Sequence, residues 1–199
     1  MTNLSGDPFI KFHHPTRIFG TVKPKSEHFQ KFFGFFRLIL FFVFYLSNNR
    51  KIHGARHSDP AKVKEIANVL WDNVQVIDEY LKKHYSVLPK KHLEIIDGWK
   101  RRICDDFILE RNLKSGSIFI SGHTDEVYLV SGIISSWEEM FYYRSPPIML
   151  HATLIPFRDV IISDGLVIPY NIVFGGNYSS EWKDIYMAAK KSGSIHKAL

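Results

Sequence analysis

The segment Pro147–Asn177 constrains the fold of this chain more than any other part of it. Its sequence, PIMLHATLIPFRDVIISDGLVIPYNIVFGGN, contains three runs of β-type residues, separated by Arg158-Asp159 and by Asp164-Gly165. An Asp-Gly pair between β-branched runs is a strong signal for a tight hairpin, because the turn needs positive φ at its central residues. The segment therefore predicts a β-rich C-terminal half.

The residues before this segment favour helices first and strands afterwards. Residues 59–84 carry apolar side chains at steps of three and four, which predicts one amphipathic helix, and residues 89–102 predict a second. From Phe107 the period changes to that of strands, and a closing helix is expected over residues 179–191. The pattern predicts an α+β fold with a helical N-terminal part, then a mainly antiparallel β-sheet or small barrel, then a closing C-terminal helix.

Composition divides the chain into three parts. Residues 1–30 contain three Pro and two Gly without a sustained period, so we expect an irregular basic arm there. Residues 31–104 form the expected helical part and residues 105–199 the β-rich part. We expect residues 31–199 to pack as one compact domain, because their number is typical of a single domain.

Residues 32–46, FFGFFRLILFFVFYL, are the most apolar stretch of the chain. A helix of this length covers about 22 Å, which is less than the roughly 30 Å of a hydrocarbon core. Three interpretations stay open: a buried core helix, which the length favours, an interfacial or partner-binding helix, which the flanking cations favour, and a membrane span, against which Arg37 argues.

The positive charge of the chain is concentrated in residues 1–58. These residues contain nine basic and two acidic side chains, a net charge of +7 against +6 for all 199 residues. A basic end of this kind favours a polyanionic partner, although the charge could also serve only solubility. The candidate residues for binding nucleic acid or another anion are Lys23, Lys25, Lys31, Arg50, Lys51, Arg56, Lys100, Arg101 and Arg102. For the last three, complementing a helix dipole is the favoured alternative.

No catalytic, metal or cofactor motif is recognisable in the sequence. It lacks the phosphate-binding GxxxxGK[ST] and GxGxxG loops, the GxSxG elbow and the HExxH pair. The single cysteine, Cys104, excludes an internal disulfide and a site with several cysteine ligands, and it fits a reducing cytoplasm. We therefore expect neither a metal nor a cofactor.

Each residue of chemical interest has a structural explanation that we favour over a catalytic one. Cys104 is expected to be buried and inert, and Asp105 and Asp106 are expected to diverge because they are neighbours in a strand. His151 could act as a general base, but a hydrogen-bonded histidine on the sheet face or in the interior is favoured. The cluster of His123, Asp125 and Glu126 is expected to be a solvated turn.

Two stretches of the chain resemble a family of uncharacterised prokaryotic proteins. The first is LIPFRDVIISDGL with the following YNIVFGG, and the second runs from Trp99 to Ser121. The resemblance extends from about Asp59 to the C-terminus, and Val160 and Ser163 stand where Lys and Tyr are commoner in the family. It supports the fold but implies no activity and no catalytic residue.

These observations favour a non-enzymatic binding or regulatory protein of the cytoplasm, whose partner and oligomeric state stay open. Nucleic-acid binding through the basic N-terminal region and peripheral membrane attachment through residues 32–46 are the alternatives. An enzyme with a dispersed active site is less favoured. His151, His123 and Asp125 are its first candidate residues.

Overall fold

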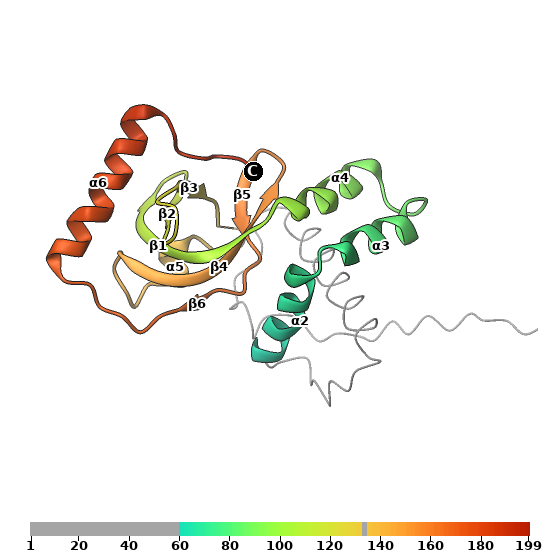
Figure 1. The fold of residues 1–199 in the computed structure, drawn as a ribbon, viewed down its shortest axis with the longest axis horizontal. Helices are drawn as coiled ribbons and strands as arrows, with labels where there is room; N and C mark the ends of the chain where they lie inside the picture. Colours follow the sequence, from blue (N-terminus) through green and yellow to red (C-terminus); the bar gives the residue numbers. More distant parts are fainter. Residues whose placement is uncertain (1–59, 133–134) are drawn as a thin grey trace, which may run out of the picture.

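The computed structural model describes residues 60–132 and 135–199. Figure 1 shows helices α2, α3 and α4 on one side of a small β-barrel and helix α6 on the other. The elements in chain order are α2 (Pro60–Asp72), α3 (Gln75–His84), α4 (Lys90–Gly98), the 3-10 turn η2 (Trp99–Arg101), β1 (Ile103–Leu113), β2 (Gly116–Ser121), β3 (Val127–Val130), α5 (Trp137–Met140), β4 (Ile148–Phe157), β5 (Val160–Ser163), β6 (Ile168–Pro169) and α6 (Gly176–Ser192). The predicted α+β class is confirmed.

The six strands form a mixed sheet in the order β1-β2-β3-β5-β4-β6. Strands β3 and β5 are parallel at Val130 and Ile161, and the other strand pairs are antiparallel. Strand β1 also pairs with β4, which closes β1, β2, β3, β5 and β4 into a ring and leaves β6 outside it. The small barrel expected from the sequence is therefore present.

Apolar side chains form three clusters that hold the layers together. One fills the barrel and includes Phe107, Phe119 and Trp137. Another joins α2, α3 and α4 to the outer face of β4 and β5, and the last packs α6 against β1, β2 and β3. Burial of these side chains is the main favourable contribution to the stability of such a fold.

The expected helix over residues 59–84 is two helices, α2 and α3, which are separated at Asn73 and Val74. Apolar residues of both helices are buried in the same cluster, Leu70 and Trp71 from α2 and Ile77 from α3. The prediction of one continuous amphipathic helix over residues 59–84 is therefore wrong. The break lets each helix orient its own apolar face toward the sheet, and neither Asn nor Val favours helix strongly.

The Asp164-Gly165 pair does not form the expected tight hairpin. Strands β5 and β6 do not pair with each other, because β6 pairs with β4 instead. The two-residue hairpin lies at the other predicted break, where Phe157 faces Val160 across Arg158-Asp159 and Arg158 takes a φ of 57°. Asp164 is fully buried. Its carboxylate accepts the Leu166 N–H, as in an Asx turn, and also the indole N–H of Trp71 from a distant helix.

Residues 1–59 lie outside the described residues, and with them the basic arm and the apolar run 32–46. The expected helical part is helical from residue 60 onward. None of the helices within residues 60–132 and 135–199 has the length and apolarity that a membrane crossing requires.

Candidate cysteine and histidine site

A polar strip crosses the outer face of the barrel where β1 and β4 lie side by side. The antiparallel register places side chains of the two strands opposite each other. Three rows result on this face: Cys104 with Thr153, Asp106 with His151, and Ile108 with Met149. Ile108 and Met149, the last row, pack under α6. The first two rows lie between the α6 cluster and the cluster of α2, α3 and α4.

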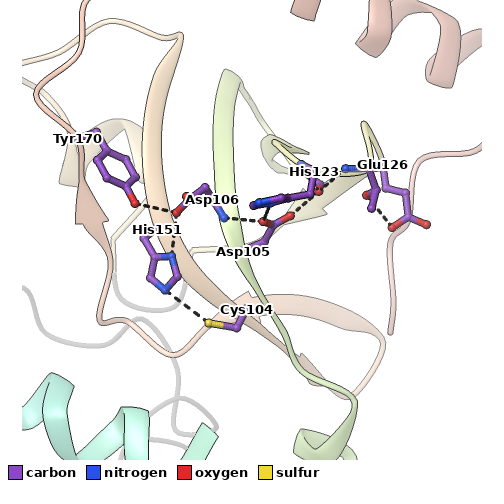
Figure 2. A network of polar contacts seen from close by, with 9 residues as sticks. Cys104, Asp105, Asp106, His123, Glu126, His151 and Tyr170 are labelled. Carbon is purple, nitrogen blue, oxygen red and sulfur yellow. Dashed lines mark hydrogen bonds and ion pairs between the residues drawn. The ribbon is translucent and has the colours of Figure 1, made fainter. Parts of the chain in front are cut away.

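Between these two clusters, a thiol contacts an imidazole, and the imidazole contacts a carboxylate (Figure 2). The Cys104 Sγ lies 3.5 Å from Nε2 of His151. The other ring nitrogen, Nδ1, lies 2.9 Å from Oδ1 of Asp106. A carboxylate accepts a hydrogen bond from the protonated nitrogen, so Nδ1 carries the proton and Nε2 offers its lone pair to the thiol.

The Asp106 carboxylate is held in its ionised form. Partial burial opposes its ionisation, but hydrogen bonds from His151 and from the Tyr170 hydroxyl outweigh burial and lower the pKa of Asp106. The Tyr170 hydroxyl donates to Oδ1 at 2.8 Å, and this bond raises the pKa of Tyr170. The tyrosine therefore stays a donor, and Asp106 stays an anion that faces the imidazole.

Cys104 is exposed, and a second polar group faces its sulfur. The hydroxyl of Thr153 donates toward Sγ at 3.6 Å. Thr153 itself is fully buried, so its hydroxyl is fixed while the thiol stays accessible from outside. The sulfur that faces His151 is therefore both held by Thr153 and open to a reactant from outside.

Strand β6 carries Tyr170 to this site. Ile168 pairs with His151, and the Tyr170 N–H donates to the Met149 carbonyl at 2.9 Å, which continues the pairing by one residue. Arg144 fixes the same segment from the loop after α5. Its guanidinium donates to the Tyr170 carbonyl at 2.7 Å and to Oδ1 of Asn171 at 3.0 Å.

A second histidine and carboxylate pair lies on the opposite face of β1. The Asp105 carboxylate contacts Nδ1 of His123 and accepts a hydrogen bond from the Ser121 hydroxyl. The turn that carries His123 approaches β1 closely, because the Gly122 N–H donates to the Asp106 carbonyl at 2.7 Å. Figure 2 shows the two pairs on either side of the strand. This second pair has no cysteine beside it.

The structure changes the interpretation of several residues. Cys104 is exposed, so the prediction that its thiol is buried is wrong. Asp105 and Asp106 diverge to opposite faces as predicted, yet each contacts a different histidine. His151 is a hydrogen-bonded histidine on the sheet face, as favoured, but its second nitrogen faces the thiol.

The turn after β2, which carries His123, Asp125 and Glu126, is exposed, as the sequence predicts for a solvated turn. Its Glu126 accepts a hydrogen bond from the Tyr128 hydroxyl at 2.7 Å, which lowers the pKa of the glutamate. Within residues 60–132 and 135–199, no group of three or more His, Cys, Asp or Glu side chains is arranged to hold a metal ion.

Two of the three described cation candidates are bound to neighbouring groups. Lys100 pairs with Asp78 and with Asp97, and these contacts raise the pKa of the lysine. Arg102 donates to the carbonyls of Trp71 and Lys100. Arg101 is exposed and lines a shallow depression. The other candidates, Lys23, Lys25, Lys31, Arg50, Lys51 and Arg56, lie outside the described residues.

Sequence reasoning considered Cys104, Asp106 and His151 separately and missed their combination. Cys104 and His151 are 47 positions apart, and the register of β1 against β4 brings them together. The alternation Cys104-x-Asp106 on one strand and His151-x-Thr153 on another was the available signal. Comparisons with family models, with curated proteins and with solved structures found no match to this chain.

Proposed function

We propose that the protein carries out thiol-dependent acyl transfer or hydrolysis, with Cys104 as the nucleophile. The observation that carries the proposal is the ordered contact of Cys104 Sγ with His151 Nε2 and of His151 Nδ1 with Asp106. A nucleophile beside a base, with a third group orienting the base, is the general arrangement for covalent catalysis by cysteine.

Each group has a role in a balanced reaction. Nε2 of His151 takes the proton of the Cys104 thiol as the sulfur attacks the carbonyl carbon of an acyl donor. The protonated imidazole is stabilised by Asp106 and gives its proton to the leaving group as the bond to the acyl carbon breaks. Water or a second nucleophile then attacks the thioester carbonyl and gives its proton to Nε2 of His151. The bond from the acyl carbon to sulfur breaks, and His151 returns the proton to Cys104.

The proposal differs from the binding or regulatory role that the sequence favours, which stays a prediction. The nucleic-acid alternative now depends chiefly on the six candidate cations outside the described residues, because Lys100 and Arg102 contact protein groups. The membrane alternative depends on residues 32–46, outside the described residues. A cytoplasmic location belongs to the present proposal, since an exposed thiol persists in a reducing compartment.

The first experiment measures the reactivity of the thiol. Because the sequence contains one cysteine, alkylation by iodoacetamide can be followed as a single mass increase of the intact protein. We expect His151→Asn to slow alkylation at neutral pH by at least about tenfold, because the base beside the sulfur is lost. His123→Asn is the matched control, since that histidine contacts Asp105 on the other face of β1. Equal rates for the two variants would contradict the proposal.

The second experiment tests acyl transfer itself. p-Nitrophenyl acetate should acetylate Cys104, and the wild-type protein should then release acetate and turn over. Cys104→Ser should show neither the adduct nor turnover above the buffer rate. If alkylation depends on His151 but no acyl adduct forms and no turnover occurs, the thiol is activated for a different reaction and the acyl-transfer proposal fails.

A further inference from the structure

The connection between α3 and α4 lies at the end of the helical part that points away from the barrel (Figure 1). Two of its side chains, Tyr85 and Val87, are each 75% exposed. We call these two residues the apolar tip. Two side chains are too few for a protein interface, so what they can contact depends on the groups around them.

The apolar tip is held by an ordered turn. The N–H groups of Val87 and Leu88 both donate to the His84 carbonyl at 3.0 Å. Leu88 packs against the core cluster of α2, α3 and α4, and the His84 ring stacks on Tyr80 with ring centroids 4.2 Å apart. Leu88 thus anchors the turn while Tyr85 and Val87 stay exposed. A turn that is already ordered loses little conformational entropy when its exposed side chains make a contact.

Lysines flank the apolar tip on both sides. Residues 82–91, KKHYSVLPKK, contain four lysines and no acidic residue, and all four lysines are exposed. Glu94 pairs with Lys90 at 3.7 Å, but the two side chains are 61% and 88% exposed, and a surface pair of this kind contributes little. The apolar tip therefore lies between two pairs of positive charges.

We propose that the apolar tip is a docking site for an anionic lipid surface. Tyrosine is enriched at the boundary between lipid and water, where the ring enters the apolar layer and the hydroxyl stays hydrated. The flanking lysines are attracted by the negative surface potential of anionic lipids. Insertion of apolar side chains and attraction of charge add together in peripheral membrane binding.

Val87 favours lipid over nucleic acid as the anionic partner. Lysines contact the phosphates of either. A single-stranded nucleic acid offers bases that stack on aromatic rings, and an aliphatic side chain gives no such stacking. A lipid surface offers an apolar layer that accepts Tyr85 and Val87 alike. Only lipid therefore gives both exposed side chains a favourable environment.

Vesicle flotation of the full chain is the first test. We expect the wild-type protein to float with vesicles that contain phosphatidylglycerol but not with vesicles of phosphatidylcholine alone, and added salt should weaken the binding. Val87→Asp should weaken it by at least about tenfold, because an inserted side chain is replaced by a carboxylate that the lipid repels. Val173→Asp is the matched control, because Val173 is 95% exposed in the segment before α6.

A pair of charge variants tests the flanking lysines. Lys82→Gln combined with Lys91→Gln removes two charges beside the apolar tip and should weaken vesicle binding by at least about tenfold. Lys183→Gln combined with Lys191→Gln removes the same charge from exposed positions of α6 and is the matched control. Circular dichroism should show all variants folded. Equal losses for the two double variants would mean that only net charge matters, which would contradict the proposal.

A fluorescent label separates the apolar tip from other membrane contacts of the chain. In Cys104→Ser protein, Val87→Cys carrying a polarity-sensitive fluorophore should brighten when vesicles containing phosphatidylglycerol are added, and Val173→Cys with the same label should not. If residues 32–46 alone hold the protein on the vesicle, the protein floats while the label at position 87 stays in water. That result, or no flotation at all, would overturn the proposal. The inference is independent of the chemistry at Cys104.

Discussion

Trp71 of α2 donates its indole N–H to Oδ2 of Asp164 at 2.9 Å, across 93 positions of sequence. Both side chains are buried, and the other carboxylate oxygen accepts the Leu166 N–H at 3.0 Å. The bond joins the helical part to the end of β5. A buried carboxylate is costly to leave without donors, so this contact fixes how the helices sit on the barrel.

Replacing Trp71 by Phe should therefore destabilise the protein. The ring contacts are largely kept, but the buried Asp164 carboxylate loses one donor, which costs about 1–3 kcal/mol of the free energy of unfolding. Urea denaturation followed by circular dichroism measures this loss. Trp137→Phe is the matched control, because the buried indole nitrogen of Trp137 has no hydrogen-bond partner within the part of the chain that the structure describes. A Trp71 variant that loses no more stability than the Trp137 variant would contradict the argument.

The raised pKa of Asp164 predicts how the free energy of unfolding changes with pH. Burial raises the pKa of its carboxyl above the ordinary value of 3.8, although nearby Lys64 partly offsets this effect. Above that value the native state binds more protons than the unfolded state, so stability falls as pH rises until the folded carboxyl has also ionised. Asp106, whose pKa is lowered, acts in the opposite direction, and its contribution is lost only as the pH falls below the ordinary value.

Urea denaturation from about pH 5 to about pH 8 avoids the Asp106 effect, because Asp106 is then ionised in both the folded and the unfolded protein. We expect Asp164→Asn to be less stable overall but to lose less stability as the pH rises. Asp159→Asn, at an exposed turn position, should reproduce the wild-type dependence. Parallel profiles for the wild-type and Asp164→Asn proteins would show that this carboxyl titrates normally.

At the candidate site, Asp106→Asn should slow alkylation of Cys104 by at least about tenfold, because the imidazole loses the anion that fixes its tautomer and stabilises its protonated form. Tyr170→Phe keeps the carboxylate and removes one donor to it, so its effect should be smaller. Asp105→Asn is the control on the neighbouring residue, since Asp105 faces His123. Alkylation rates, measured from the mass of the intact protein, rank the three variants. Equal effects of Asp106→Asn and Asp105→Asn would argue against an oriented His151.

Local patterns in the sequence were sufficient for the class of fold but not for the site. Alternation and helical periods follow from which side chains face a core, so the strands around Phe119 and Leu154 and the closing helix were predictable. The contact of Cys104 with His151 depends on strand register, which no local pattern contains. The same holds for Asp164, where the Asp-Gly pair predicted a tight hairpin that does not form and where the contact with Trp71 comes from a distant helix.

Gly122→Ala should damage the site from outside it. An added Cβ would lie 2.8 Å from the backbone carbonyl of Asp106, too close for any real contact, so the turn after β2 must move away from β1. The move strains the bond from the Gly122 N–H to that carbonyl, and we expect a loss of about 1–3 kcal/mol in the free energy of unfolding together with slower alkylation of Cys104. Gly175→Ala is the matched control, because a Cβ there meets nothing within 4 Å. Urea denaturation and intact-mass kinetics measure both effects, and a stable variant with wild-type alkylation would show that the close approach of this turn does not position Asp106.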